Sequence, residues 1–303
     1  MFPEPWPRRI IPHCPTPQPI TELTALLQSL GIPHELVVTH DAPNPTAVAV
    51  LAHLPHKPDL RAVYAQLVDE FPTRGFWPVL THQQTHNQGY YPWVTGDLVE
   101  PSTDLIFTDL HPFYSHAGAD FFERPKGIDP EQLSDADWEE EQFWSGRNFP
   151  DNSDELKAAF FASLTEKHRT TDYLEIPEPN LDPIPASLGL DDPVALLITP
   201  VNRPTDVPAA VGWLGACNYD FAGFHLSSVL RSWEDRFGAV LIQLENQIMT
   251  LAVPTLQLTN QQRNLLALEH YFFCRDTIDG LDDFLLYTND ECLNQNEWYF
   301  WWD

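Results

Sequence analysis

Positive charge is scarce in this sequence. Its 303 residues include 16 Lys and Arg against 44 Asp and Glu, which gives a formal net charge of -28. A field of that sign repels phosphate backbones and anionic lipid, so we expect neither nucleic acid nor a membrane as a partner. The same field attracts cations and basic proteins, although an acidic coat can also serve only to keep a protein in solution.

Long apolar runs and paired cysteines are also missing. No stretch approaches the roughly 18 apolar residues that cross a bilayer, and residues 1–9 lack the run of about seven apolar residues that a secretion signal needs. Cys14, Cys217, Cys274 and Cys292 form no CxxC pair, so they predict neither a disulfide framework nor a cysteine zinc site. We therefore expect a cytoplasmic protein.

Two helix–strand repeats occupy the start of the chain. Residues 21–30 place apolar side chains on one helical face and end at Gly31, and residues 34–40 (HELVVTH) read as a strand. Residues 59–71 repeat the helical pattern, and residues 76–82 (FWPVLTH) form the next strand. Consecutive units of this kind usually place their strands parallel in one sheet. We therefore expect both strands, each ending in Thr-His, to end at the same edge.

Repeated prolines at residues 176–193 mark a boundary in the chain. We expect an α/β region over residues 1–180, with an acidic Pro-rich middle, and an α+β domain over residues 194–303. In the second unit two predicted helices flank a hairpin at residues 239–253. The fold class is therefore α/β to α+β, with a mixed sheet flanked by helices.

Five consecutive aromatics, WYFWW, follow Glu297 in the second unit. In an extended strand Trp298 and Phe300 face one way, while Tyr299 and Trp301 face the other. Each large aromatic gains roughly 2 kcal/mol or more by burial. We therefore expect a buried aromatic strand in the interior of the sheet. The alternative is an exposed patch that docks a partner, for which Trp and Tyr are favoured.

Several segments of the second unit resemble one known family. They are LRSWEDRFGA at residues 230–239, the hairpin whose second strand ends in AVP, EHYFFCRD at residues 269–276, and WYFWWD at residues 298–303. In this order they resemble the bacterial domain of unknown function 4253, over about residues 194–303. The resemblance implies a cytosolic bacterial protein and brings no activity with it.

The predicted helix that follows the hairpin contains the segment EHYFFCRD. Glu269 lies on the apolar face of this helix, beside Leu265 and Phe272. An ionised carboxylate there costs several kcal/mol unless a cation meets it. We therefore expect Arg231 or Arg236 to pair with Glu269. Such a pair either braces the domain or waits for a ligand.

His270 and Cys274 lie four residues apart on the same helix, so they share a face. As base and nucleophile they would need an orienting group and an electropositive setting. This helix is apolar nearly all round, which favours structural roles instead, and we assign no catalytic residue. The candidate binding residues are Trp233, Arg236, Glu269, His270, Trp298 and Trp301.

His40, His82 and His86 are candidate metal ligands. His82 and His86 have the HxxxH spacing that aligns two imidazoles on a helix, and His40 joins them if the two strands are parallel. The polar segment around His86 resembles a loop, which favours ordinary surface histidines. Zinc is the one cofactor this set suggests; otherwise we expect none.

These observations favour a non-enzymatic, acidic protein-binding module, of an immunity or antitoxin-like kind, whose partner is a basic protein. A metal-assisted hydrolase that uses the three histidines is the alternative. No GxGxxG, P-loop or GxSxG motif occurs in the sequence, so nucleotide binding and serine-hydrolase chemistry have no sequence support.

Overall fold

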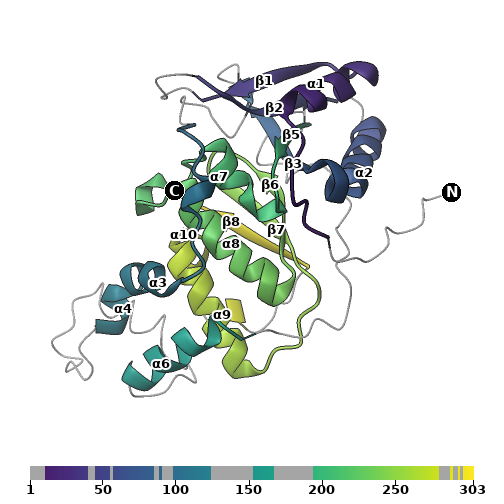
Figure 1. Cartoon of the computed structure of the whole chain (residues 1–303). Helices are drawn as coiled ribbons and strands as arrows, with labels where there is room; N and C mark the ends of the chain where they lie inside the picture. The colour runs from purple at the N-terminus through teal and green to yellow at the C-terminus, as the bar shows by residue number, and fades with distance from the viewer. Residues whose placement is uncertain are drawn as a thin grey trace.

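A mixed β-sheet runs through the computed structural model (Figure 1). The structure describes residues 11–39, 45–54, 57–84, 89–90, 98–123, 153–166, 194–279, 287–288, 293 and 296–303. The strands lie in the order β1-β2-β5-β3-β6-β7-β8, and β4 pairs with β3. Their bounds are β1 (His34–Val38), β2 (Ala47–His53), β3 (Phe76–Gln84), β4 (Gly89–Tyr90), β5 (Val194–Pro200), β6 (Val240–Leu244), β7 (Ile248–Ala252) and β8 (Glu297–Trp301). The pair β3–β6 is parallel and the other pairs are antiparallel, so the sheet is mixed as predicted.

Helices lie at both ends of the sheet (Figure 1). Their bounds are α1 (Ile20–Ser29), α2 (Lys57–Arg74), α3 (His111–Ala117), α4 (Ala119–Glu123), α6 (Ser153–Ser163), α7 (Val207–Val211), α8 (Gly223–Phe237), α9 (Asn260–Phe273) and α10 (Arg275–Asp279). Three short 3-10 turns are η1 (Thr103–Leu105), η4 (Pro204–Asp206) and η5 (Cys217–Tyr219). Helix α1 packs on β2 and α2 on β3 and β5, whereas rings of α8 and α9 pack on β8. The α+β class is therefore confirmed.

Strand β5 joins the two predicted units in a single sheet. It belongs to residues 194–303 but lies between β2 and β3, with Ile198 opposite both Val50 and Pro78. Residues 195–198 are fully buried, as expected for a continuous apolar run that is covered on both faces. The Pro-rich boundary at residues 176–193 lies outside the described residues.

The prediction that residues 34–40 and 76–82 form parallel strands is wrong. Strand β1 pairs antiparallel with β2, β2 with β5, and β5 with β3. Strands β1 and β3 therefore run in opposite directions, and their carboxyl ends lie at opposite edges of the sheet. We did not expect β2, although its apolar run AVAVLA is a strand signal. Because β2 pairs antiparallel with both β1 and β5, the strand directions alternate from β1 to β3.

Helix α8 buries one apolar stripe at helical spacing. Its members are each at most 1% exposed: Leu226, Val229, Leu230, Trp233 and Phe237. The helix ends at Gly238, whose φ of 72° is left-handed, a conformation that glycine adopts at little cost. Helix α9 begins at Thr259, where the Thr259 hydroxyl and the Gln262 side chain bond each other's backbone N–H in a capping box.

Strand β8 is the aromatic strand predicted from WYFWW, but it lies at an edge of the sheet. Among the described strands it pairs with β7 alone. Trp298 and Phe300 are buried against α8 and α9. Tyr299 and Trp301, on the other face, are 50% and 38% exposed. The buried aromatic strand is confirmed for one face, whereas its expected place in the sheet interior is wrong.

Candidate functional site

Five of the six candidate binding residues meet in one buried cluster. They are Trp233 and Arg236 of α8, Glu269 and His270 of α9, and Trp298 of β8. Each is at most 4% exposed. The sixth, Trp301, lies on the opposite face of β8 and takes no part. We call these five residues the buried network.

An ion pair lies at the centre of the buried network. Arg236 Nη1 donates to Glu269 Oε1 at 2.9 Å, and Arg236 Nη2 donates to Glu269 Oε2. The Trp233 indole N–H also donates to Oε2, at 2.9 Å. Arg236 makes two further bonds, to the Ser163 carbonyl of α6 and the Ser232 hydroxyl. Because Glu269 is fully enclosed by these donors, the pair ties α6, α8 and α9 together, and the expected partnership with Arg236 is found.

The side chains of His270 and Cys274 do not bond to each other; the Cys274 N–H donates to the His270 carbonyl at 2.8 Å. His270 Nδ1 lies 2.7 Å from the Tyr287 hydroxyl, and its Nε2 bonds to no described residue. The Cys274 thiol donates to the Trp301 carbonyl at 3.0 Å. Burial raises the pKa of the Cys274 thiol to about 12, so the thiolate that a nucleophile needs is not populated near neutral pH. Both side chains are buried and bond within the molecule.

We expect His270 to make the protein less stable in acid. Burial, aided by the charge of Arg236, holds the His270 pKa well below its usual 6.5. Below pH 6.5 the unfolded chain binds a proton at this residue and the folded protein does not. Stability is therefore complete above about pH 6.5 and falls by about 1.4 kcal/mol per pH unit as the pH drops toward the folded pKa.

Urea unfolding at several pH values measures this dependence. Below pH 6.5 the free energy of unfolding of the His270→Asn variant should depend less steeply on pH than that of the wild type, by about one proton per molecule. Wild-type and His270→Asn curves that run parallel below pH 6.5 would contradict the assignment.

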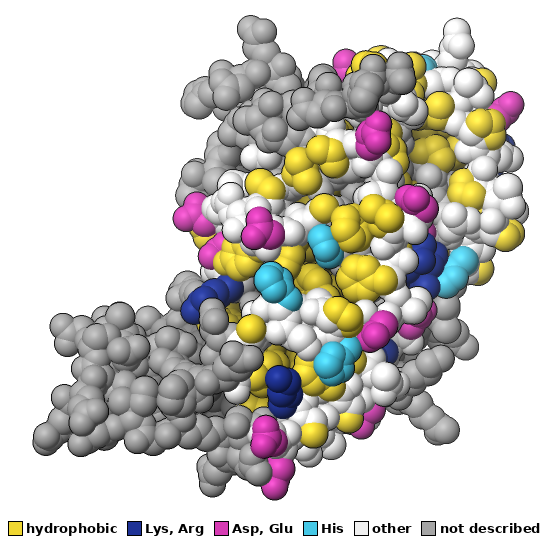
Figure 2. Space-filling model, turned by 60° about the vertical axis from the view of Figure 1, so that its left-hand side comes forward, with side chains coloured by type: hydrophobic (Ala, Val, Ile, Leu, Met, Phe, Trp, Pro, Cys, Tyr) yellow, Lys and Arg dark blue, Asp and Glu magenta, His cyan; other side chains and the backbone are white. Residues whose placement is uncertain are grey.

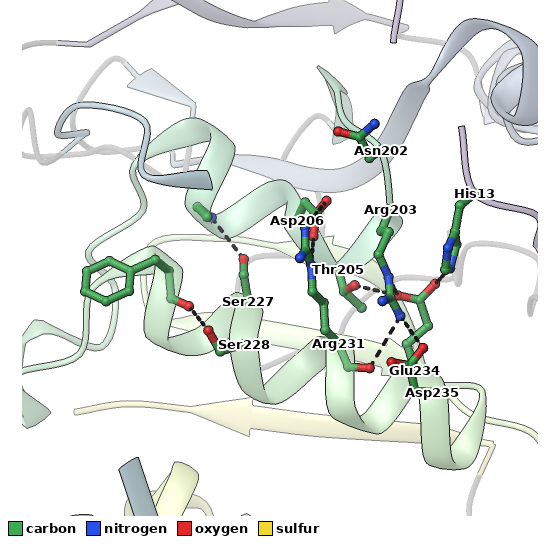
Figure 3. Close-up of polar contacts among 12 residues, drawn as sticks. His13, Asn202, Arg203, Thr205, Asp206, Ser227, Ser228, Arg231, Glu234 and Asp235 are labelled. Carbon is green, nitrogen blue, oxygen red and sulfur yellow. Dashed lines mark hydrogen bonds and ion pairs between the residues drawn. The ribbon is translucent and has the colours of Figure 1, made fainter. Parts of the chain in front are cut away.

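A second polar cluster, which the residue pattern did not indicate, joins α8 to the segment after β5 (Figure 3). Arg203 Nε donates to Glu234 at 2.9 Å, and Arg203 Nη2 donates to Asp235 at 2.6 Å. The Thr205 hydroxyl donates to Glu234 at 2.6 Å, and His13 Nε2 lies 3.0 Å from the same carboxylate. Glu234 therefore joins the N-terminal segment, η4 and α8.

Arg231 lies beside this cluster and pairs with Asp206 (Figure 3). Its Nε and Nη2 donate to the two carboxylate oxygens of Asp206 at 2.6 and 2.9 Å. Such a bidentate contact is the strongest arrangement of this ion pair. Arg231 is therefore not the partner of Glu269, and both arginines of this cluster are neutralised within the molecule.

Hydrophobic and histidine side chains lie together on the face of the molecule that Figure 2 shows. Among the ring contacts of α3 and α8, His225 lies 4.0 Å from Phe224, and His111 stacks on Phe161 at 4.0 Å. His225 Nδ1 accepts the Ala222 N–H at 3.0 Å, which caps the start of α8. Burial, and then the charge of His116, lower the His225 pKa. His111 and His225 therefore pack against phenylalanine rings, and His225 also caps the start of α8.

The proposed metal ligands are not brought together by the described strands. His40 and His86 lie outside the described residues, and of His82 only the backbone is described, in β3 opposite Val194. Because β1 and β3 run in opposite directions, the reason for placing His40 beside His82 no longer holds. Among the described side chains no group of three His, Cys, Asp or Glu could hold a metal ion.

The sheet, its helices and the buried network define an α+β protein. Residues 195–303 match the family model described as Domain of unknown function (DUF4253). This match confirms the resemblance drawn from the sequence and includes α8, α9 and β8, which supply the buried network. No curated protein and no solved structure matches the chain. In the described part of the chain no helix is long and apolar enough to cross a membrane.

Proposed function

We propose that this protein is a non-enzymatic binding protein whose acidic surface engages a basic protein partner, in the manner of an immunity or antitoxin protein. The observation that carries the proposal is the excess of carboxylates, with a formal net charge of -28. Glu22, Glu100, Asp104 and Glu155 are exposed examples. None of these four side chains bonds to a described residue, so they remain available to steer a cationic partner.

In the described part of the chain, the arginines of α8 and of the segment after β5 are paired with carboxylates inside the molecule. Arg236 and Glu269 neutralise each other, and the raised pKa of Cys274 keeps its thiol protonated. Arg203 and Arg231 are held by carboxylates of their own. This inward pairing supports a binding role over a catalytic one.

A pull-down with tagged protein, followed by a salt titration, tests the proposal. Raising the ionic strength from about 0.05 to about 0.5 M shortens the screening length severalfold. We expect the recovered partners to be basic, and their recovery to fall at least about tenfold over this range. Partners that are acidic, or that bind independently of salt, would contradict the proposal.

A matched pair of variants separates charge from other surface effects. Replacing Glu22, Glu100, Asp104 and Glu155 with their amides removes four negative charges, from -28 to -24. This variant should bind the basic partner less tightly at low salt. A control that replaces the exposed residues Gln28 and Gln261 with Ser leaves the charge unchanged and should bind as the wild type does.

A further inference from the structure

Among the residues that the structure describes, none pairs with the outer edge of β8 over its first half. The Trp302 N–H bonds across to the β6–β7 turn at 3.0 Å, whereas the Trp301 N–H bonds to Thr277 of α10, on the other side, at 2.8 Å. Backbone groups alternate between the two edges of a strand, so those of Glu297 and Tyr299 point the same way as those of Trp301. Within the described residues, no hydrogen bond reaches the backbone of Glu297 or Tyr299 along this edge.

Aromatic side chains and the Glu297 carboxylate share one face of this strand. Tyr299 is 50% and Trp301 38% exposed, on the face of β8 opposite α8. Glu297 shares their face of the strand. Aromatic rings and carboxylates both attract Lys and Arg side chains.

An unpaired strand edge is a template for a further strand. A second copy of this chain would bring another net charge of -28 to the edge, so self-pairing is opposed by repulsion. A basic segment is complementary to the Glu297 carboxylate. The charge of this surface therefore favours a cationic segment. The unpaired backbone groups require that this segment be extended, as a β-strand is.

Resting on the proposed function, we propose that the β8 edge at Glu297 and Tyr299 binds an extended Lys- or Arg-bearing segment of the basic partner as an added strand. The backbone of that segment bonds to Glu297 and Tyr299, and its cationic side chains lie over the rings of Tyr299 and Trp301. Thr277 already occupies the edge at Trp301 and limits the added strand to the first half of β8.

Amide hydrogen exchange on the full chain tests the added strand, with a peptide of about nine residues that alternates Lys and Val as the probe. In the free protein the amides of Glu297 and Tyr299 should exchange fast, and the peptide should slow them by at least about tenfold. The amides of Trp298 and Phe300 bond toward β7 and should stay protected in both states.

A proline variant tests the backbone contact itself. Tyr299→Pro removes an N–H that the ladder with β7 does not use, a position where edge strands tolerate proline. It should keep the wild-type melting temperature within a few degrees and weaken peptide binding by about tenfold or more. The matched control Tyr299→Ala also loses the ring but keeps the N–H, so it should bind the peptide more tightly than Tyr299→Pro does.

Unchanged exchange of Glu297 and Tyr299 in the presence of the Lys-Val peptide would overturn the inference, whether or not the proline variant folds. Equal binding of a Lys-Pro peptide of the same charge would also overturn it, because proline lacks the N–H that a ladder needs. Both results leave the proposed function intact. The proposed function fails instead if the pull-down yields no salt-sensitive basic partner.

Discussion

Replacing Glu269 with Gln is expected to lower the free energy of unfolding by about 3–5 kcal/mol. The change leaves the Arg236 guanidinium buried without a counter-charge, at 4% exposure. It also replaces a carboxylate that accepts bonds from Arg236 and Trp233 with an amide that presents one oxygen and one NH₂. Urea unfolding followed by circular dichroism measures the loss.

Asp235→Asn is the matched control, because Asp235 also pairs with an arginine but is 54% exposed. Solvent screens that pair, so its loss should cost about 1 kcal/mol or less. A Glu269→Gln variant that is no less stable than Asp235→Asn would show that the buried ion pair does not brace the domain. That result would mean that folding does not depend on Glu269, as expected of a residue that binds a ligand.

Replacing Trp298 with Ala is expected to cost about 3–5 kcal/mol. Its ring lies 4.4 Å from His270, 5.5 Å from Trp233 and 5.7 Å from Phe237, so truncation opens a cavity among rigid neighbours. Trp298→Phe should cost less, because it keeps ring packing and removes a buried indole N–H that bonds to no described residue. Thermal and urea unfolding of both variants measure the difference.

Trp301→Ala is the control on the other face of β8. Trp301 is 38% exposed, and its bonds to Thr277 and Cys274 come from the backbone, which the substitution keeps. We expect a loss of about 1 kcal/mol. Equal losses at Trp298 and Trp301 would contradict the one-sided burial of this strand.

Local patterns predicted much of the C-terminal half. The α8 stripe and its end at Gly238 follow from helical periodicity and from the freedom of glycine at positive φ. The capping box at Thr259 needs residues only three apart. Because a buried carboxylate requires a cation, the sequence predicted that Glu269 pairs with Arg231 or Arg236.

Non-local features were missed or misplaced. The directions of β1 and β3 depend on β2, and on the insertion of β5 from more than a hundred residues away. The cluster around Glu234 joins His13, Arg203 and α8 across gaps of 221 and 31 residues. Nothing in the spacing of those residues indicates that they meet, because such contacts exist only once the segments are packed.

The sequence by itself determined the apolar face of α8, the end of α8 at Gly238, the cap of α9 at Thr259 and an excess of negative charge that repels anions. Those properties come from side-chain chemistry and from contacts a few residues apart. Only the tertiary structure decided which strands are neighbours, that Arg236 and not Arg231 meets Glu269, and that Tyr299 and Trp301 of the aromatic strand stay partly exposed. These outcomes depend on the packing of distant segments, where burial and chain connectivity select among arrangements that are locally equivalent.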